Sequence, residues 1–326
     1  MKDWLFREAA HLALTRPLAR LIGRARRSGV DAELDPQIAA VLELQRLLRL
    51  PALDSMEPAR ARAFAAAGLS PLDAALEPMA QVIDCTVAGS IPVRIYVPEA
   101  ATPHWIIYLH GGGGVIGSIH SSEPVTRLLA AQTRCTVASV DYRLGPEHRH
   151  PAAIDDACAA WEALMPRVAG RAAVAGDSFG GFLAAHVDHA VRRKPDLQVL
   201  FYPIVDLTLS SPSIERFADG YLLTRSMTHW FRANYLHPDD DRKAASPQHW
   251  PSLRGAAPAI VATAGYDPLV DEGDHYAELL RAAGTEVRHR RYPALIHGFL
   301  SLAGAVDAAR AATDELCGDI RDLLVR

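Results

Sequence analysis

The serine at position 178 lies between two glycines, in the run Gly176-Asp177-Ser178-Phe179-Gly180. A short apolar run precedes it, and a helix-like segment begins at Phe179. A sharp strand-to-helix turn exposes a serine hydroxyl, and its neighbours must be small because the strand and helix backbones pass close together. The pentapeptide alone is common, but this context favours a nucleophile over a chance loop. We predict that Ser178 is a nucleophile and that the residues around it support the turn.

A nucleophilic serine also needs donors for the oxyanion that forms when it attacks a carbonyl. The run His110-Gly111-Gly112-Gly113-Gly114 follows an apolar, strand-like segment. Consecutive glycines cost backbone entropy on folding, so the interior of a helix or strand disfavours them. They do allow bare N–H groups to approach a substrate oxygen. A flexible linker is the alternative, but linkers rarely follow an apolar strand directly. We therefore predict an oxyanion-binding loop here.

The base and the acid that orients it are expected further along the chain. Asp267 directly follows a strand-like run, whereas Asp271 and Asp274 belong to the start of the next helix, where we expect them to cap it. Of the 14 histidines, His297 falls in a loop after the final strand and before a helix. The order of Ser178, Asp267 and His297 is the Ser…Asp…His order of α/β-hydrolases.

These residues need a scaffold, and strand and helix patterns alternate after residue 80. Strands are expected at 82–87, 93–97, 105–109, 135–140, 172–175, 199–202, 259–264 and 287–292. Helices are expected at 123–132, 152–164, 179–192, 273–283 and 303–324. This alternation predicts a mostly parallel, eight-stranded sheet with helices on both faces. The first two strands should form an antiparallel hairpin, because their connection is too short for a crossover.

Two segments depart from this alternation. Residues 4–27 have a helical pattern rich in arginine, with a break or kink expected at Pro17, and Asp35-Pro36 resembles the start of a second helix. Residues 206–250 form a long irregular insertion with a helix around Trp230, and insertions of this length often act as lids. We expect the insertion to meet the N-terminal helices over the active site. The arginines could suggest an anionic membrane surface, but nearby acidic residues favour a solvated helix face.

The resulting division has four parts. We predict an N-terminal helical cap segment at 1–50, the first part of the core at 51–205, a cap or lid insertion at 206–250 and the second part of the core at 251–326.

Composition restricts the classes of partner. The chain has 326 residues, of which 49% are hydrophobic and 22% charged, as in an ordinary soluble domain. A net charge of −4 gives no reason to expect nucleic acid. No apolar run reaches the roughly 18 residues of a membrane span, and no secretory leader is recognisable, so a cytoplasmic protein is expected. The four cysteines form no C-x-x-C pair and are expected to be buried thiols without a metal.

Several separated blocks together resemble one known family. The blocks are His110-Gly111-Gly112-Gly113, Asp141-Tyr142-Arg143-Leu144-Gly145-Pro146-Glu147, Gly176-Asp177-Ser178-Phe179-Gly180-Gly181, Asp267-Pro268-Leu269 and His297-Gly298-Phe299. They are similar to the HGGG, DYRLAPE, GDSAGG, DPL and HGF blocks of the hormone-sensitive lipase family of bacterial esterases, which have the α/β-hydrolase fold. The similarity runs from about residue 80 to the C-terminus, and the N-terminal helices resemble that family's cap.

The resemblance implies particular roles. The N–H groups of Gly112, Gly113 and Phe179 would form the oxyanion hole, no metal or organic cofactor would be required, and the protein would be a monomer or homodimer. In the block around Tyr142, Arg143 and Glu147 could form an ion pair with a structural role.

The chain departs from the family pattern beside the nucleophile. Gly114 stands where the family usually has an aromatic residue, Phe179 replaces a small residue and Phe182 replaces an asparagine. We assign Gly114, Phe182 and Tyr202 to the substrate pocket. Our hypothesis is that Phe179 narrows this pocket and favours short acyl chains.

The sequence therefore predicts a serine carboxylesterase that hydrolyses small-molecule esters with short to medium acyl chains. An amidase or deacetylase on the same triad is one alternative, because the fold does not fix the reaction. A non-catalytic, ligand-binding protein on the same fold is the other, although such proteins typically lack one member of the triad.

Overall fold

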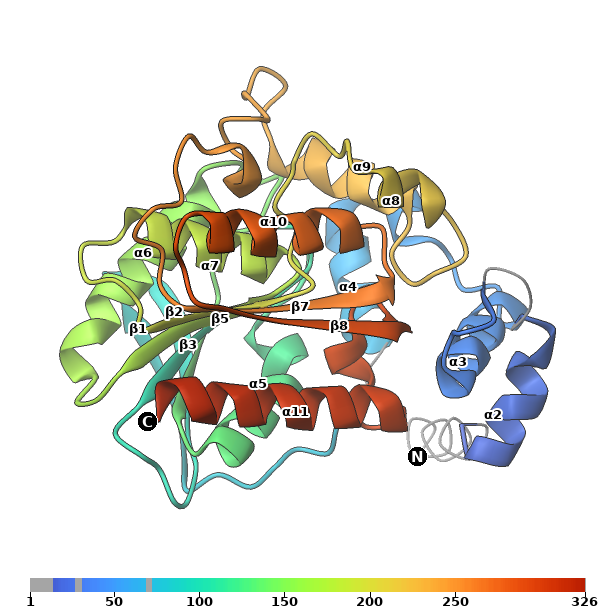
Figure 1. Cartoon of the computed structure of the whole chain (residues 1–326), viewed down its shortest axis with the longest axis horizontal. Coiled ribbons are helices and arrows are strands. Elements are labelled where there is room, and N and C mark those ends of the chain that lie inside the picture. Colours follow the sequence, from blue (N-terminus) through green and yellow to red (C-terminus); the bar gives the residue numbers. More distant parts are fainter. Residues whose placement is uncertain (1–13, 27–30, 69–71, 326) are drawn as a thin grey trace.

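The protein is described from a computed structural model that covers residues 14–26, 31–68 and 72–325. Its centre is an eight-stranded sheet with the order β1-β2-β4-β3-β5-β6-β7-β8 (Figure 1). The strands are β1 Gln81–Val87, β2 Ile91–Val97, β3 Trp105–Leu109, β4 Thr136–Val140, β5 Ala172–Asp177, β6 Leu197–Phe201, β7 Ala259–Tyr266 and β8 Val287–Ile296. All eight strands were predicted from the sequence.

Most neighbouring strands are parallel, and only β2 runs against both of its neighbours, β1 and β4. The predicted hairpin of β1 and β2 is confirmed, with Val87 opposite Ile91. Ala88 and Gly89 have positive φ angles in its turn, which glycine adopts at little cost. The prediction of a mostly parallel, eight-stranded sheet is also confirmed.

Helices cover both faces of the sheet (Figure 1). One face packs against α5 Ile119–Thr133 and α11 Asp307–Leu324, and the other against α6 Ala152–Leu164, α7 Phe179–Ala190 and α10 Val270–Ala282. Side chains alternate between the faces along each strand. Tyr108 therefore joins the apolar core under α5 and α11, and its neighbour Leu109 joins the core under α6, α7 and α10.

Several boundaries differ from the sequence prediction. The strand β8 continues to Ile296 instead of ending at Tyr292, although it contains Pro293. A proline is tolerated there because β8 is the last strand of the sheet and one of its sides needs no N–H donor. The helix α5 begins at Ile119, where Ser118 and Ser121 form a capping box. The helix α11 begins at Asp307, because residues 299–302 form a separate 3-10 turn.

The N-terminal part contains α2 Arg16–Ile22, η1 Gly23–Ala25, α3 Pro36–Leu47, η3 Leu53–Ser55 and α4 Pro58–Gly68. The predicted helix start at Asp35 is confirmed, because its carboxylate accepts the N–H groups of Gln37 and Ile38. Pro17 lies in the first turn of α2, where proline is tolerated. Residues 4–13 and residue 27 of the predicted helical pattern lie outside the described residues.

The insertion contains α8 Pro212–Arg216, α9 Arg225–Tyr235 and η5 Pro247–His249, and a further 3-10 turn, η4 Met165–Arg167, follows α6. The strands β7 and β8 point towards the side where α4, α8 and α9 lie (Figure 1). Trp230 and Phe231 of α9 pack with Met56 and Ala61 from the N-terminal part. The insertion therefore contacts η3 and α4, which belong to the segment predicted as core and not to the predicted cap segment 1–50. It also reaches the predicted cap segment, because the hydroxyl of Tyr221 donates to Asp31.

Within the part of the chain that is described, no helix has the length and apolar character needed to cross a membrane.

Candidate active site

The turn that carries Ser178 has a strained backbone. Ser178 joins β5 to α7 with φ 54° and ψ −114°, a region that L-residues with side chains rarely adopt. The turn is possible because the chains around it touch without side chains between them. A Cβ atom on Gly180 would lie 1.8 Å from the carbonyl oxygen of Leu109, and one on Gly176 would lie 2.2 Å from the backbone of Gly180. Glycine is therefore required at both positions.

A chain of hydrogen bonds joins the three residues predicted as a triad. The Nε2 atom of His297 lies 2.9 Å from the Ser178 hydroxyl oxygen, and its Nδ1 atom lies 2.8 Å from a carboxylate oxygen of Asp267. Asp267 is only 1% exposed and also accepts the backbone N–H of Leu269 at 2.8 Å. These residues follow the carboxyl ends of parallel strands, so the sheet brings them to one edge. The arrangement allows His297 to take a proton from Ser178.

The two competing acids make other contacts. Asp271 pairs with Arg216 at 2.6 Å, and Asp274 binds Thr263, His289 and Arg291. The prediction that they cap α10 is wrong, because neither carboxylate accepts an N–H of its first turn among the described residues, and the hydroxyl of Ser213 accepts the N–H of Asp271 instead. Asp271 is in its first turn, and Asp274 is one turn further on, where it reaches across to β8.

Tyr202 lies behind His297, the predicted base. Its ring meets the imidazole of His297 edge-on at 4.9 Å and the ring of Phe299 at 5.0 Å. Its side chain is 1% exposed, so it is part of the protein interior. The structure thus places Tyr202 where it supports His297, and not on the exposed surface of a pocket.

The glycine loop has a backbone that few other residues could adopt. Gly112, Gly113 and Gly114 have φ angles of 114°, 61° and 71°. Among the described residues, no acceptor binds the N–H groups of Gly112, Gly113 or Phe179. The N–H of Phe179 is also at the first turn of α7, where helix N–H groups lack internal partners and the helix dipole favours negative charge. The three predicted donors are therefore free to bind an oxyanion.

Two carbonyl groups fix the direction of these donors. The C=O and N–H of a trans peptide point in opposite directions. The carbonyl of Gly111 lies 2.7 Å from Nδ1 of His110, which orients the N–H of Gly112 away from that ring. The carbonyl of Gly112 accepts the N–H groups of Val115 and Ile116, both at 3.0 Å, which orients the N–H of Gly113 in the same way.

His110 is itself held firmly. The hydroxyl of Tyr142 donates to the His110 carbonyl at 2.6 Å, and the two rings stack with centroids 4.3 Å apart. A carbonyl oxygen can only accept, so the Nδ1 atom facing Gly111 carries the proton. Burial lowers the pKa of His110, which keeps its ring neutral.

Asp177 anchors the start of the loop from below. Its carboxylate accepts the hydroxyl of Tyr108 at 2.6 Å and the N–H of Gly111 at 2.8 Å. Burial raises the pKa of Asp177, although both hydrogen bonds favour its ionised form. A Cβ atom on Gly111 would lie 2.4 Å from this carboxylate. The nucleophile turn and the glycine loop are thus joined by one side chain.

The predicted ion pair of Arg143 and Glu147 is wrong. Arg143 binds Asp156 on α6 at 2.8 Å, and Glu147 binds Arg62 on α4. Residues 141–147 still have a structural role. Asp141 at one end holds α5 close to the glycine loop, and Glu147 at the other end holds α4 there. Asp141 accepts the first N–H of α5, from Ile119, at 3.1 Å.

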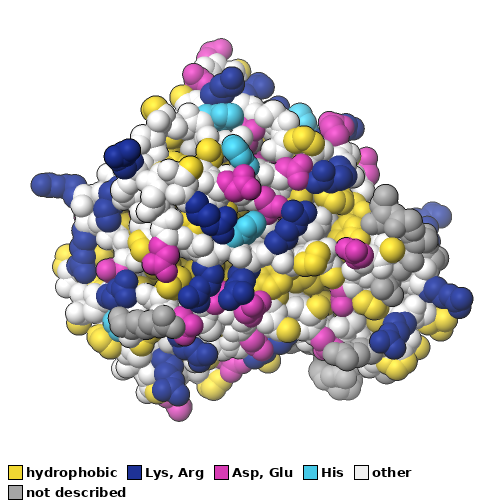
Figure 2. All heavy atoms as spheres, in the orientation of Figure 1, with side chains coloured by type: hydrophobic (Ala, Val, Ile, Leu, Met, Phe, Trp, Pro, Cys, Tyr) yellow, Lys and Arg dark blue, Asp and Glu magenta, His cyan; other side chains and the backbone are white. Residues whose placement is uncertain are grey.

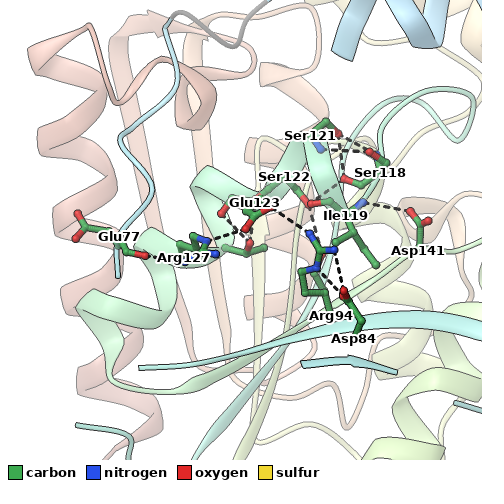
Figure 3. A network of polar contacts seen from close by, with 12 residues as sticks. Glu77, Asp84, Arg94, Ser118, Ile119, Ser121, Ser122, Glu123, Arg127 and Asp141 are labelled. Atoms are coloured by element: carbon green, nitrogen blue, oxygen red, sulfur yellow. Dashed lines mark hydrogen bonds and ion pairs between the residues drawn. The ribbon is translucent and has the colours of Figure 1, made fainter. Parts of the chain in front are cut away.

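Figure 3 shows how the start of α5 is anchored. Asp141 and the capping box of Ser118 and Ser121 hold its first turn, and Arg94 of β2 bonds to Glu123 of α5 and to Asp84 of β1. Because only residues 115–118 separate the glycine loop from α5, this network holds the chain that leaves the loop.

Aromatic rings from two segments surround the nucleophile's neighbour. The ring of Phe179 is 1% exposed, stacks on Phe182 at 5.1 Å and meets Tyr235 of α9 edge-on at 4.7 Å. A Cβ atom on Gly114 would lie 2.8 Å from both Phe179 and Tyr235. Phe179 therefore occupies the space that a side chain at position 114 would need. Phe182 lies deeper, completely buried under Phe179, so its assignment to the surface of the substrate pocket is wrong.

Phe231 of α9 covers the oxyanion loop. A Cβ atom on Gly113 would lie 2.3 Å from its ring. The sequence predicted a lid in the segment of Phe231 without singling out this residue, and it indicated no role for Tyr108, Tyr142 or Arg62. A tyrosine inside an apolar strand usually needs a partner for its hydroxyl, and this signal could have singled out Tyr108.

The site was also compared with known proteins. The family model described as the alpha/beta hydrolase fold matches residues 106–301, which is more than half of the chain. The chain belongs to this alpha/beta-hydrolase family. The matched residues of this hydrolase include the glycine loop, Ser178, Asp267 and His297.

Two relatives and one solved structure show the range of similarity. A carboxylic ester hydrolase of Mycobacterium tuberculosis, LipN, is 38% identical over 95% of this chain and 89% of its own. An ethyl acetate hydrolase of Pseudomonas putida is 36% identical over 68% of this chain and 74% of its own. The ester hydrolase EH1AB1 from the metagenome of Lake Arreo, solved with a bipyridine phosphonate derivative, has a TM-score of 0.84 and 36% identity over 89% of this hydrolase and 98% of that chain.

Proposed function

We propose that this protein is a serine carboxylesterase that hydrolyses small esters with short to medium acyl chains through an acyl-enzyme on Ser178. The observation that carries the proposal is the hydrogen-bonded line from Ser178 through His297 to Asp267, beside three N–H groups that bind no acceptor among the described residues. The names of the relatives, an ethyl acetate hydrolase among them, support an ester substrate.

Acylation follows from this geometry. His297 takes the proton of Ser178 as the hydroxyl oxygen attacks the ester carbonyl, and buried Asp267 stabilises the imidazolium that forms. The N–H groups of Gly112, Gly113 and Phe179 bind the oxyanion. Removing one donor of this kind typically costs about 2.7–4 kcal/mol of transition-state stabilisation. His297 then gives its proton to the departing alcohol, and the acyl group remains on Ser178.

Deacylation repeats these steps with water. His297 takes a proton from a water molecule, which attacks the acyl carbonyl in the same oxyanion hole. The proton returns to Ser178 as the carboxylic acid leaves. The residues described here supply the base, the nucleophile and the donors for both halves of the reaction.

Finer assignments extend this proposal. The HGGG-like loop and the DYRLAPE-like block support membership of the hormone-sensitive lipase family. We also propose a cytoplasmic location, a cap built from residues 1–50 and 206–250, and a monomer or homodimer.

The first prediction tests the nucleophile. Ser178→Ala should lower the hydrolysis of p-nitrophenyl butyrate by about 10⁴-fold or more, because a triad without its nucleophile keeps only oxyanion binding. The backbone of the turn should persist, so the thermal unfolding midpoint should stay close to that of the wild type. Ser213→Ala is a matched control, because this buried serine bonds only to backbone groups near Asp267. Substantial turnover by Ser178→Ala would contradict the assignment.

The alternative reactions are separated by two further measurements. A fluorophosphonate should label wild-type Ser178, and the absence of labelling would favour a ligand-binding protein. Matched ester and amide substrates with the same acyl group should show a strong preference for the ester. Equal rates on both would favour the amidase.

A further inference from the structure

Arg62 of α4 joins an N-terminal helix to the residues beside the glycine loop. Its Nε atom donates to the carbonyl of Val115 at 2.7 Å, and its Nη2 atom donates to the carbonyl of Gly145 at 2.7 Å. The same guanidinium binds the carboxylate of Glu147 at 2.9 and 2.5 Å. The hydrogen bonds from Arg62 lower the pKa of Glu147 to about 2, so the pair stays ionised at neutral pH.

These acceptors are directly connected to the oxyanion donors. Val115 follows the glycine loop, and its N–H binds the carbonyl of Gly112 that orients the N–H of Gly113. The N–H of Gly145 binds the carbonyl of Gly114 at 2.7 Å. Arg62 therefore fixes the peptide groups on which the direction of the Gly113 donor depends.

We propose that Arg62 is a positioning residue for the oxyanion hole, which is fully formed only while α4 is docked. The inference rests on the proposed function, because it assigns Arg62 an effect on the oxyanion of that reaction. The other parts of the loop have their own anchors in the core. Asp177 holds its beginning, and the start of α5 holds its end (Figure 3). Arg62 is the contact that makes the middle of the loop depend on an N-terminal helix.

A purely structural ion pair is the simpler explanation for Arg62. Glu147 is 53% exposed, and exposed ion pairs contribute little to stability. The geometry favours positioning because two of the donors of Arg62 bind backbone carbonyls next to the loop, which an ion pair alone does not require.

The second prediction compares Arg62→Met, Arg62→Lys and Arg60→Met. Arg60 is an exposed arginine on the same helix with no described contact to the loop, so it controls for loss of charge from α4. Arg62→Met should lower kcat for p-nitrophenyl butyrate by about tenfold or more, less than the roughly 100–1000-fold for removing a donor itself. KM should change little. A trifluoromethyl ketone, which forms an oxyanion on Ser178, should bind more weakly by a similar factor.

The Arg62→Lys variant and hydrogen exchange at the amides after the glycine loop provide the most informative measurements. Arg62→Lys should recover part of kcat, because an ammonium can still donate to one carbonyl. Hydrogen exchange at Val115 and Ile116 should become faster in Arg62→Met and stay unchanged in Arg60→Met. The exchange measurement needs no turnover, so it tests the positioning even if the ester assay of the wild type fails and refutes the proposed function.

Two results would overturn the inference. One is unchanged exchange at Val115 and Ile116 in a folded Arg62→Met variant. The other is an equal loss of activity in Arg62→Met and Arg60→Met, or a loss that is confined to KM.

Discussion

The site contains two buried histidines, His297 and His110, whose surroundings suit them to different roles. His297 has a hydroxyl on one ring nitrogen and a carboxylate on the other, so the ring can accept a proton and remain stable as a cation. His110 faces a carbonyl and stacks on Tyr142, and burial lowers its pKa. One ring can therefore move protons, while the other stays neutral and orients a peptide. At the scale of single residues, the groups that each imidazole contacts decide its role.

The third prediction concerns Phe179, whose ring fills the space beside Gly114. Phe179→Leu should open this space and shift activity towards longer acyl chains, with relative kcat/KM for hexanoate over acetate rising about tenfold. One methylene of fit in an apolar pocket is worth roughly 10–200-fold. Leucine is preferable to alanine, because truncating a buried Phe to Ala costs about 3–5 kcal/mol. The assay is a series of p-nitrophenyl esters from acetate to octanoate.

Phe182→Leu is the control for this series. Phe182 is equally buried but lies one turn further along α7, behind Phe179. Its variant should keep the wild-type order of substrates. An unaltered chain-length profile in Phe179→Leu would contradict the idea that Phe179 limits the acyl group.

At the scale of elements, Glu272 of α10 binds the segment that follows β6. Its buried carboxylate accepts the N–H groups of Val205 at 2.7 Å and Asp206 at 3.0 Å, where the insertion begins. Burial raises the pKa of Glu272 well above its usual range, and the nearby charges of Asp206 and Asp267 act in the same direction. The helix α10 and the start of the insertion therefore share one buried carboxyl group that resists ionisation.

The fourth prediction follows from the sign of this shift. The unfolded chain loses the Glu272 proton at its ordinary pKa of about 4.5, while the folded protein keeps it to a higher pH. The contribution of Glu272 to stability should therefore decline as pH rises above about 4.5, by up to about 1.4 kcal/mol per pH unit. Glu272→Gln lacks this proton, so it should gain stability relative to the wild type between pH 5 and 8. Urea unfolding at several pH values measures the difference.

Glu278→Gln serves as the comparison on the same helix. Its side chain is 74% exposed, so it should not change the pH dependence. A constant difference between Glu272→Gln and the wild type across this pH range would show that Glu272 ionises normally.

At the scale of the whole molecule, charged side chains tie the last strand to the helices beside it. Basic and acidic groups interleave across the face over β8 (Figure 2). Arg288 and Arg290 of β8 bind Asp319 of α11 at 2.6 and 2.7 Å, and Arg291 binds Asp274 of α10 at 2.6 Å. Charges on an edge strand also disfavour pairing with another sheet.

The fifth prediction concerns Asp319. Burial would raise its pKa, but the hydrogen bonds from Arg290 and Arg288 outweigh this and leave the pKa below its usual value. Its stabilising contribution is therefore present at neutral pH and is lost as pH falls below about 4. Asp319→Asn should destabilise the protein at pH 7 by about 1.5 kcal/mol, at the lower end for bonds to charged groups because the arginines are partly exposed. Urea unfolding at pH 7 and pH 3.5 measures both values.

Asp314→Asn provides the contrast within α11. Asp314 forms an exposed pair with Arg310 one turn away, and such pairs are worth only about 0.3–0.5 kcal/mol. If Asp319→Asn is no more destabilising than Asp314→Asn, the contacts to β8 contribute no more than a surface pair.

The sequence was most informative where local patterns determine structure. Apolar runs predicted every strand, and the glycines around Ser178 predicted a tight turn, because both depend on neighbouring residues. Partners far apart in the chain were harder. Arg143 and Glu147 were paired because they are close in sequence, yet their partners are Asp156 and Arg62. The spacing of charges cannot show which helix will pack beside them.

The end of β8 illustrates the same limit. Pro293 suggested that the strand stops, and only its position at the sheet edge explains why it continues to Ile296. Tyr202 was likewise assigned to the pocket, and its ring faces His297 from the protein interior.

The contacts of Arg62 have a consequence for how the two parts of the chain evolve. Arg62 lies outside residues 106–301, the part of the chain that matches the family, whereas its acceptors Val115, Gly145 and Glu147 lie within it. Recombination that exchanged the first hundred residues between relatives would separate the donor from its acceptors. The two parts should therefore descend together, and a chimaera would need to carry a matching arginine to keep its activity.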